Sequence, residues 1–143
     1  MVSKTKLLAT FVPVAAAYLF AALMTNNVVY AAGSQHLDVK ITSVHNGEKV
    51  PVGKLTISGT SSATPGTKCE VYADWSDKAP YQLVKATGPG GANDYSKWKF
   101  TYTSKYHLIT EGDTNNLTGK IECSGGQKAF NSVDVIGVTR SQN

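Results

Sequence analysis

The sequence predicts an all-β protein, a β-sandwich of about seven strands behind an N-terminal helical signal segment. Three observations lead to this prediction. Beyond residue 32, stretches of alternating apolar and polar residues recur at a spacing of roughly ten residues. Gly, Pro, Asn and Asp separate these stretches, as expected of turns. No amphipathic pattern of about ten residues or more indicates a helix there.

The first 32 residues have the parts of a secretory signal in the usual order. Lys4 and Lys6 precede an apolar run over residues 7–24, and Ala31 and Ala32 supply the small residues needed for cleavage. A retained N-terminal membrane anchor is the alternative, because the 18 residues of the run are the lower limit for a spanning helix. The many alanines in the run favour a cleaved signal peptide. In both cases the folded domain lies outside the cytoplasm.

Residues 33–143 are long enough for one compact domain. Removing Lys4 and Lys6 from the 14 basic residues leaves 12 against 10 acidic ones, a formal charge of +2. The remaining lysines are scattered, and Arg140 is the only arginine. This distribution argues against a nucleic-acid partner.

The first three expected strands are short. Residues 37–44 alternate between apolar and polar side chains and lead into an Asn-Gly turn signal at Asn46. Residues 50–52 briefly resume the extended pattern, and residues 54–59 alternate again. A connection rich in Ser, Thr, Pro and Gly follows at 60–66.

The middle of the chain carries three more expected strands, at 69–75, 81–87 and 97–103. A turn at 76–80 separates the first two, and the run of breakers at 88–94 must be a loop. The third strand alternates most clearly, with three aromatic residues on one face.

A turn at 111–116 precedes the last two expected strands, at 117–124 and 129–139. A Gly-Gly pair at 125–126 separates them. The whole series of short strands with intervening turns is typical of a β-sandwich.

The two cysteines, Cys69 and Cys123, predict one disulfide in an exported protein. Each shares a strand face with an apolar neighbour, Val71 and Ile121 respectively, so both sulfurs point to the core side. Two buried free thiols, or a thiol that pairs with another molecule, are the alternatives. The bond would close a loop of about 55 residues and stabilise the fold on the order of 4 kcal/mol.

Five segments together resemble prokaryotic immunoglobulin-like domains; they are Gly53–Thr60, Cys69–Trp75, Tyr95–Tyr102, Ile109–Asp113 and Leu117–Cys123. The resemblance extends over residues 37–139 and implies an Ig-like β-sandwich that serves as an extracellular structural, adhesive or binding module without catalysis. The cysteine pair and the enlarged 88–94 loop depart from the family pattern. The cysteine positions also suggest that the disulfide joins neighbouring strands instead of the two sheets.

Nothing in the sequence predicts an enzyme, a cofactor or a metal site. The three histidines are isolated and lack a second ligand at the spacing that metal sites use. Asp74, Asp77 and Asp94 could meet at one end of the sandwich and hold calcium, but they form no dense acidic loop. Ordinary solvated carboxylates are therefore the favoured interpretation.

Aromatic residues are the better indication of function. Trp75, Trp98 and Phe100 alternate onto inner faces and are expected in the core. Five other rings do not follow the inner-face pattern, namely Tyr72, Tyr81, Tyr95, Tyr106 and His107. Tyrosine beside Asn, Asp and Gly suits contact with a sugar or a protein. Scattered surface tyrosines are the alternative.

The longest unpatterned stretch, residues 88–96, is the expected recognition loop. We expect Asn93, Asp94 and Tyr95 to contact a ligand or partner, together with Asp77 and Tyr81. In the competing interpretation, Tyr95 only packs over the edge of the Trp98 strand and the loop is a spacer.

Asn116 begins the sequence Asn-Leu-Thr, a possible N-glycosylation site at a turn that enters a strand. The function expected from these observations is a non-enzymatic binding or structural module, secreted or at the cell surface, whose partner is an extracellular protein or a glycan. A small secreted carbohydrate-binding accessory protein is the second candidate. A secreted enzyme that uses the Asp residues is a distant third.

Overall fold

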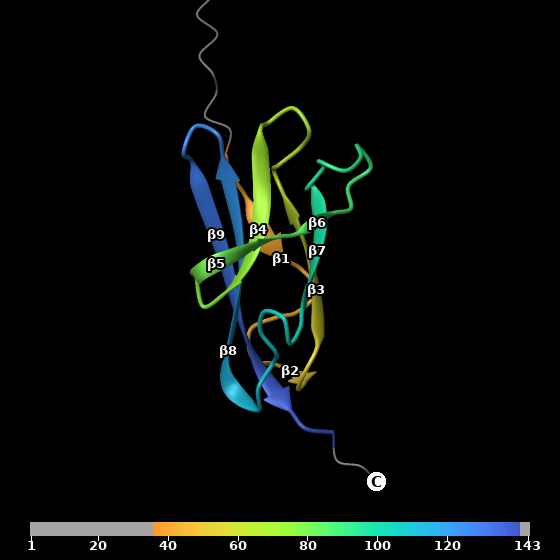
Figure 1. Cartoon of the computed structure of the whole chain (residues 1–143), viewed down its shortest axis with the longest axis vertical. Helices are drawn as coiled ribbons and strands as arrows, with labels where there is room; N and C mark the ends of the chain where they lie inside the picture. The colour runs from red at the N-terminus through yellow and green to blue at the C-terminus, as the bar shows by residue number, and fades with distance from the viewer. Residues whose placement is uncertain (1–35, 141–143) are drawn as a thin grey trace, which may run out of the picture. The chain divides into compact units, whose positions relative to one another are not determined.

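The computed structural model describes residues 36–140, and this part of the chain forms nine β-strands and no helix. The predicted signal segment, residues 1–32, lies outside the described residues. The strands are labelled in Figure 1; they are β1 (Val39–Ile41), β2 (Glu48–Pro51), β3 (Leu55–Ser61), β4 (Cys69–Trp75), β5 (Lys78–Leu83), β6 (Lys85–Ala86), β7 (Lys97–Tyr102), β8 (Gly112–Cys123) and β9 (Lys128–Val138).

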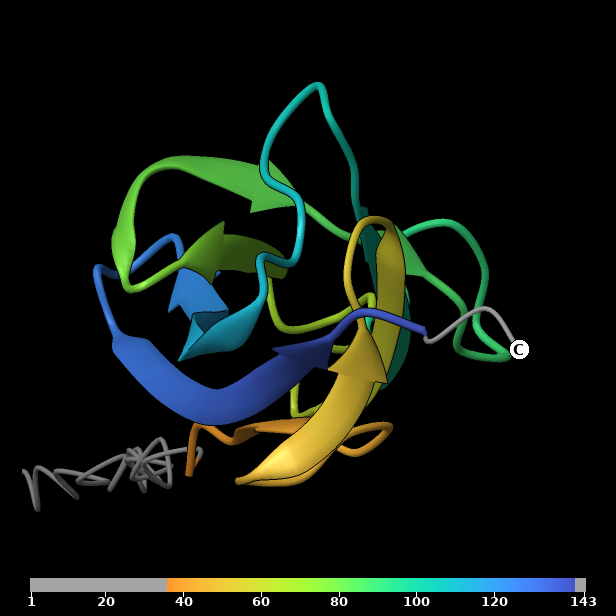
Figure 2. The same ribbon diagram turned by 90° about the horizontal axis from the view of Figure 1, so that it is seen from below.

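The strands form two sheets that pack face to face, as the end-on view in Figure 2 shows. One sheet has the order β1-β3-β7-β6 and the other the order β2-β9-β8-β4-β5. All pairings are antiparallel except that of β2 with β9. The predicted β-sandwich is confirmed, and its strand order corresponds to that of immunoglobulin sandwiches, with strands added at both edges of the second sheet.

Two regions differ from the sequence prediction, and the first of them adds a strand to the expected number. Residues 81–87 do not form one strand, since β5 pairs with β4 and β6 pairs with β7 in the other sheet. The chain crosses between the sheets at the buried Val84 (Figure 1). The expected turn at 111–116 is also wrong, because β8 already begins at Gly112.

The core is built around Trp98 of β7, which is 1% exposed and lies against two glycines. A Cβ atom on Gly59 of β3 would come within 2.3 Å of the Trp98 ring, so only glycine fits there. The indole N–H donates to the carbonyl oxygen of Thr60 at 3.1 Å. The expectation of a core tryptophan at this position is confirmed, while Trp75 and Phe100 are only half-buried.

The predicted disulfide is present between Cys69 and Cys123, with no free cysteine among the described residues. The two residues lie directly opposite each other on the adjacent strands β4 and β8, with their Cα atoms 4.0 Å apart. The bond therefore joins neighbouring strands of one sheet. It fixes the end of the sandwich at which β4 begins and β8 ends.

Candidate functional site

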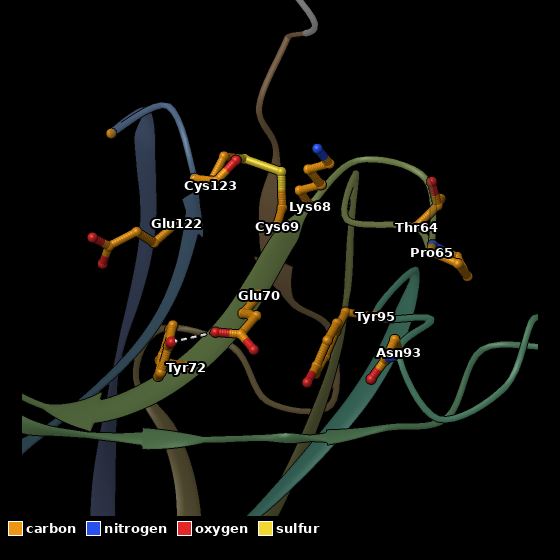
Figure 3. A pocket seen from close by; sticks show the side chains of 12 residues that line it. Thr64, Pro65, Lys68, Cys69, Glu70, Tyr72, Asn93, Tyr95, Glu122 and Cys123 are labelled. Atoms are coloured by element: carbon orange, nitrogen blue, oxygen red, sulfur yellow. Dashed lines mark hydrogen bonds between the residues drawn. A yellow bond between two sulfur atoms is a disulfide. The ribbon is translucent and has the colours of Figure 1, made fainter.

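A pocket of about 560 Å³ opens at this end of the sandwich, next to the disulfide (Figure 3). It is built by β4 and β8 next to the disulfide, the 62–68 connection, the turn after β8 and the 88–96 loop. Its lining is polar with two aromatic rings. The lining residues are Thr64, Pro65, Lys68, Cys69, Glu70, Tyr72, Asn93, Tyr95, Glu122, Cys123, Ser124 and Gly126.

Glu70 and Tyr72 form one wall of the pocket. Both point outward from β4, because the alternation that turns Cys69 and Val71 inward places them on the opposite face. The Tyr72 hydroxyl donates a hydrogen bond of 2.6 Å to Glu70 Oε2. This bond and the nearby carboxylate raise the pKa of Tyr72 to about 12. Tyr72 therefore stays protonated and holds the Glu70 side chain in place.

Glu122 extends this wall from β8, directly across the ladder from Glu70. Two like charges facing each other on neighbouring strands would repel. Lys120 and Lys128 neutralise Glu122, with Nζ to carboxylate distances of 3.0 Å and 3.2 Å. Their hydrogen bonds lower the pKa of Glu122. Glu70, by contrast, has no lysine partner among the described residues.

Asn93 and Tyr95 form the opposite wall (Figure 3). Tyr95 is only 4% exposed, and its backbone carbonyl oxygen accepts a 2.7 Å hydrogen bond from the Ser61 hydroxyl. Its own hydroxyl has no hydrogen-bond partner among residues 36–140. Burial, with the Glu70 charge as a second cause, raises the pKa of Tyr95. Tyr95 thus combines a fixed ring with an unused hydroxyl at the pocket.

Asp94 shapes the loop between these two residues. It is 5% exposed, and its carboxylate accepts hydrogen bonds from the N–H groups of Gly90 at 2.7 Å and Ser96 at 3.0 Å. The Ser96 side chain, and then these two backbone N–H groups, lower the pKa of Asp94. A Cβ atom on Gly88 would lie 2.3 Å from the Asp94 carboxyl carbon, so the loop can close around the carboxylate only with glycine there. The Asp94 carboxylate is thus already hydrogen-bonded within its own loop, so Asp94 positions the loop.

The structure does not bring all five predicted contact residues together. Asn93 and Tyr95 line the pocket, while Asp77 and Tyr81 lie outside its lining. Asp77 occupies the turn before β5 in a left-handed conformation, with φ of 51°. Tyr81 lies on the outer face of the five-stranded sheet, where its ring centre is 3.9 Å from Lys120 Nζ.

Tyr81, Leu83 and Phe130 form a second surface, which we call the sheet-face patch. All three are well exposed, at 39%, 53% and 51%. Lys120, 3% exposed, lies between the rings of Tyr81 and Phe130 and approaches the Phe130 ring centre to 5.7 Å. This ammonium is held by cation–π contacts and by Glu122.

The expectation that Asp74 is solvated is wrong. Its side chain is fully buried, and neither carboxylate oxygen has a hydrogen-bond partner among the described residues. Burial, and then the nearby charge of Asp77, raises the pKa of Asp74 to about 6. Asp74 lies at the point where the pairing of β4 with β5 shifts register, between the pairs Ala73–Gln82 and Trp75–Lys78.

Asn116 lies within β8, opposite Asp134 of β9, and not at a turn as expected. Its side-chain amide donates to Asp134 Oδ1 at 2.6 Å, and its amide oxygen accepts from the Thr118 hydroxyl at 3.2 Å. Thr118 is fully buried. Glycosylation at Asn116 remains a prediction.

Sequence reasoning singled out Tyr72, Asn93 and Tyr95 of this lining but none of its other polar residues, among them Lys68 and Glu70. Alternation along β4 could have placed Glu70 and Tyr72 on the outer face beside each other. It could not have shown that the 62–68 connection and the 88–96 loop come together next to them. Lys68 adopts a left-handed conformation, with φ of 52°, and Figure 3 shows its side chain pointing away from Glu70.

Comparison with models of known protein families found no match, and comparison with curated protein sequences found none either. Within residues 36–140, no helix is long and apolar enough to cross a membrane. Among those same residues, no three His, Cys, Asp or Glu side chains come close enough to share a metal ion.

Proposed function

We propose that this chain is a non-enzymatic binding module, secreted or held at the cell surface, that recognises its partner through the pocket beside the disulfide. The observation that carries the proposal is the division of polar groups at this end of the molecule. Asp94 and Glu122 are used internally, whereas Asn93 and the Tyr95 hydroxyl have no side-chain hydrogen-bond partner within residues 36–140 and line the pocket.

The scaffold supports this role because it holds the pocket walls in fixed positions. The disulfide ties β4 to β8 at the rim, and the Asp94 hydrogen bonds close the 88–96 loop. A preorganised pocket binds with less loss of conformational entropy than a flexible one. The extracellular role of prokaryotic immunoglobulin-like domains, which the sequence resembles, is in keeping with such a site.

The proposed location rests on two features of the chain. The first 32 residues carry the pattern of a secretory signal, and a disulfide persists in oxidising compartments. An extracellular protein or a glycan is therefore the proposed partner, and a membrane is involved only if the N-terminal segment is retained as an anchor.

Retention of the labelled protein on the cells that produce it tests the proposal. Asn93→Trp would fill the pocket from an exposed loop position without disturbing the core. Phe130→Ala is the matched control, because it alters the sheet-face patch and leaves the pocket intact. We expect Asn93→Trp to reduce retention at least about tenfold and Phe130→Ala to leave it unchanged. Loss of retention in Phe130→Ala alone would place recognition on the sheet face.

A further inference from the structure

We infer that the pocket binds a neutral, hydroxyl-rich ligand, namely a pyranose unit of a glycan. This inference rests on the proposed binding function and adds the chemical class of the ligand. It follows from three properties of the lining: the kind of hydrogen-bonding groups left unpaired, the charge balance, and the two tyrosine rings.

The unpaired groups include both donors and acceptors. The Asn93 side chain offers an amide oxygen and an N–H₂ group, and the Tyr95 hydroxyl can donate or accept. Glu70 Oε2 accepts the Tyr72 hydrogen bond, which leaves Oε1 as a further acceptor. Vicinal sugar hydroxyls, which also donate and accept, match this combination.

The Tyr95 hydroxyl is the strongest indication of a ligand, because the residue is almost fully buried. A residue that is 96% covered normally finds an internal partner for its polar tip. Here the ring is enclosed but the hydroxyl meets the pocket and no described donor or acceptor. The arrangement leaves this group to be satisfied by water or by a ligand.

The charges around the pocket do not select an ion. Glu122 is neutralised by Lys120 and Lys128, and the lining contains one further acidic residue, Glu70, and one basic residue, Lys68. With Lys120 and Lys128 included, the charged side chains at the pocket are two acidic and three basic, so neither sign of charge dominates. An uncharged ligand fits such a mixed surface better than a strongly cationic or anionic one.

The two tyrosine rings and the pocket volume also suit a sugar unit. Tyr72 and Tyr95 stand on opposite walls and can pack against the C–H faces of a sugar ring (Figure 3). The volume of about 560 Å³ lies within the range of small-molecule sites.

Titration of the purified protein with neutral malto-, cello-, chito- and manno-oligosaccharides, followed by amide NMR and calorimetry, tests the inference. We expect at least one of them to bind and to shift the amide signals of Asn93 and Tyr95. Tyr95→Phe keeps the ring and removes only the hydroxyl, so it should weaken binding roughly three- to tenfold. Tyr81→Phe removes an equivalent hydroxyl from the sheet-face patch and should leave affinity unchanged.

Salt provides a second readout. Affinity for a neutral sugar should not change between about 0.05 M and 0.5 M NaCl, because there is no ligand charge to screen. Failure of every oligosaccharide to bind would overturn the inference, as would equal affinity of Tyr95→Phe and wild type. If no sugar binds while Asn93→Trp still abolishes retention on cells, only the ligand class is wrong. If Asn93→Trp also has no effect, the proposed function is wrong as well.

Discussion

Two buried polar side chains at different places in the sandwich, Tyr95 and Asp74, both lack a hydrogen-bond partner among the described residues. Tyr95 is 4% exposed and lines the pocket beside the disulfide. Asp74 is fully buried near the opposite end of β4 and does not line that pocket. The two groups differ in access, because water or a ligand can reach the Tyr95 hydroxyl in the pocket but cannot reach the Asp74 carboxylate.

This difference has opposite consequences for stability and binding. A hydroxyl that meets water in a pocket carries little penalty, and it is available to a ligand. Burial destabilises the charged form of a carboxylate, and burial, with the charge of Asp77 as the second cause, raises the pKa of Asp74 to about 6. At the pocket end, the free Tyr95 hydroxyl is therefore available for recognition. At the other end, the buried Asp74 carboxylate destabilises the folded state when it is ionised.

Removal of the disulfide should have the largest effect on stability. The combined change Cys69→Ala and Cys123→Ala should lower the free energy of unfolding by about 2–5 kcal/mol, because the bond closes a loop across a sequence separation of 54 residues. Chemical denaturation of the oxidised wild type and of the double variant measures it. A loss of under about 1 kcal/mol would show that the sheet holds its register without the crosslink.

Asp94→Ala should have the next largest effect. It leaves the N–H groups of Gly90 and Ser96 without their acceptor and opens the loop that carries Asn93 and Tyr95. We expect the melting temperature to fall by roughly 10 °C. Asp94→Asn, which keeps an acceptor oxygen, is the matched control and should lose less. Equal melting temperatures for Asp94→Ala and wild type would mean that the loop does not depend on this carboxylate.

Asp74→Asn should stabilise the protein at pH 7, by about 1–3 kcal/mol. The pKa of Asp74 is raised from 3.8 to about 6, so folding takes up a proton in this range. Its penalty is absent below about pH 4, grows between pH 4 and pH 6, and is complete above pH 6. The gain from Asp74→Asn should follow the same course in urea denaturation at several pH values.

Asp77→Asn is the control for this prediction. It removes the neighbouring charge from an exposed residue but leaves Asp74 buried, so its stabilising effect should be smaller. A gain in Asp74→Asn that is the same at pH 4 and pH 7 would contradict the assigned pKa.

Tyr95→Phe should have the smallest effect on stability, close to zero. The ring stays in place, and the hydroxyl has no hydrogen bond within the described part of the chain to lose. Tyr102→Phe is an informative contrast, since the buried Tyr102 hydroxyl donates to the Asp74 carbonyl oxygen at 2.7 Å and its loss should be destabilising. Equal destabilisation by the two changes, in thermal melts, would mean that the Tyr95 hydroxyl is used inside the fold.

Much of the fold follows from local pattern. Alternation in 69–75 and 97–102 predicts both strands and the inward positions of Cys69 and Trp98, because one face of each is buried. The division of 81–87 between two sheets was not predictable, since it depends on which neighbour each half pairs with. The same holds for the start of β8 at Gly112, where pairing with Gly137 overrides the turn-like local sequence.

The site was predictable only in part, for a similar reason. The Gly-rich composition of 88–94 indicated a loop, and Asn93 and Tyr95, two of the residues expected to contact a partner, line the pocket. The Asp94 carboxylate points back into its own loop because backbone N–H groups bind it there. The positions of these N–H groups cannot be predicted from a sequence pattern. The burial of Asp74 is likewise not determined by composition.

Photocrosslinking on the producing cells tests the central claim most directly. A benzophenone amino acid replaces Thr64, an exposed residue that lines the pocket, or Phe130 on the sheet-face patch, and mass spectrometry identifies the adducts. We expect abundant adducts from position 64 and few from position 130, with the position 64 adducts lost on addition of excess unlabelled wild-type protein. Adducts from position 130 alone would contradict the assignment of recognition to the pocket.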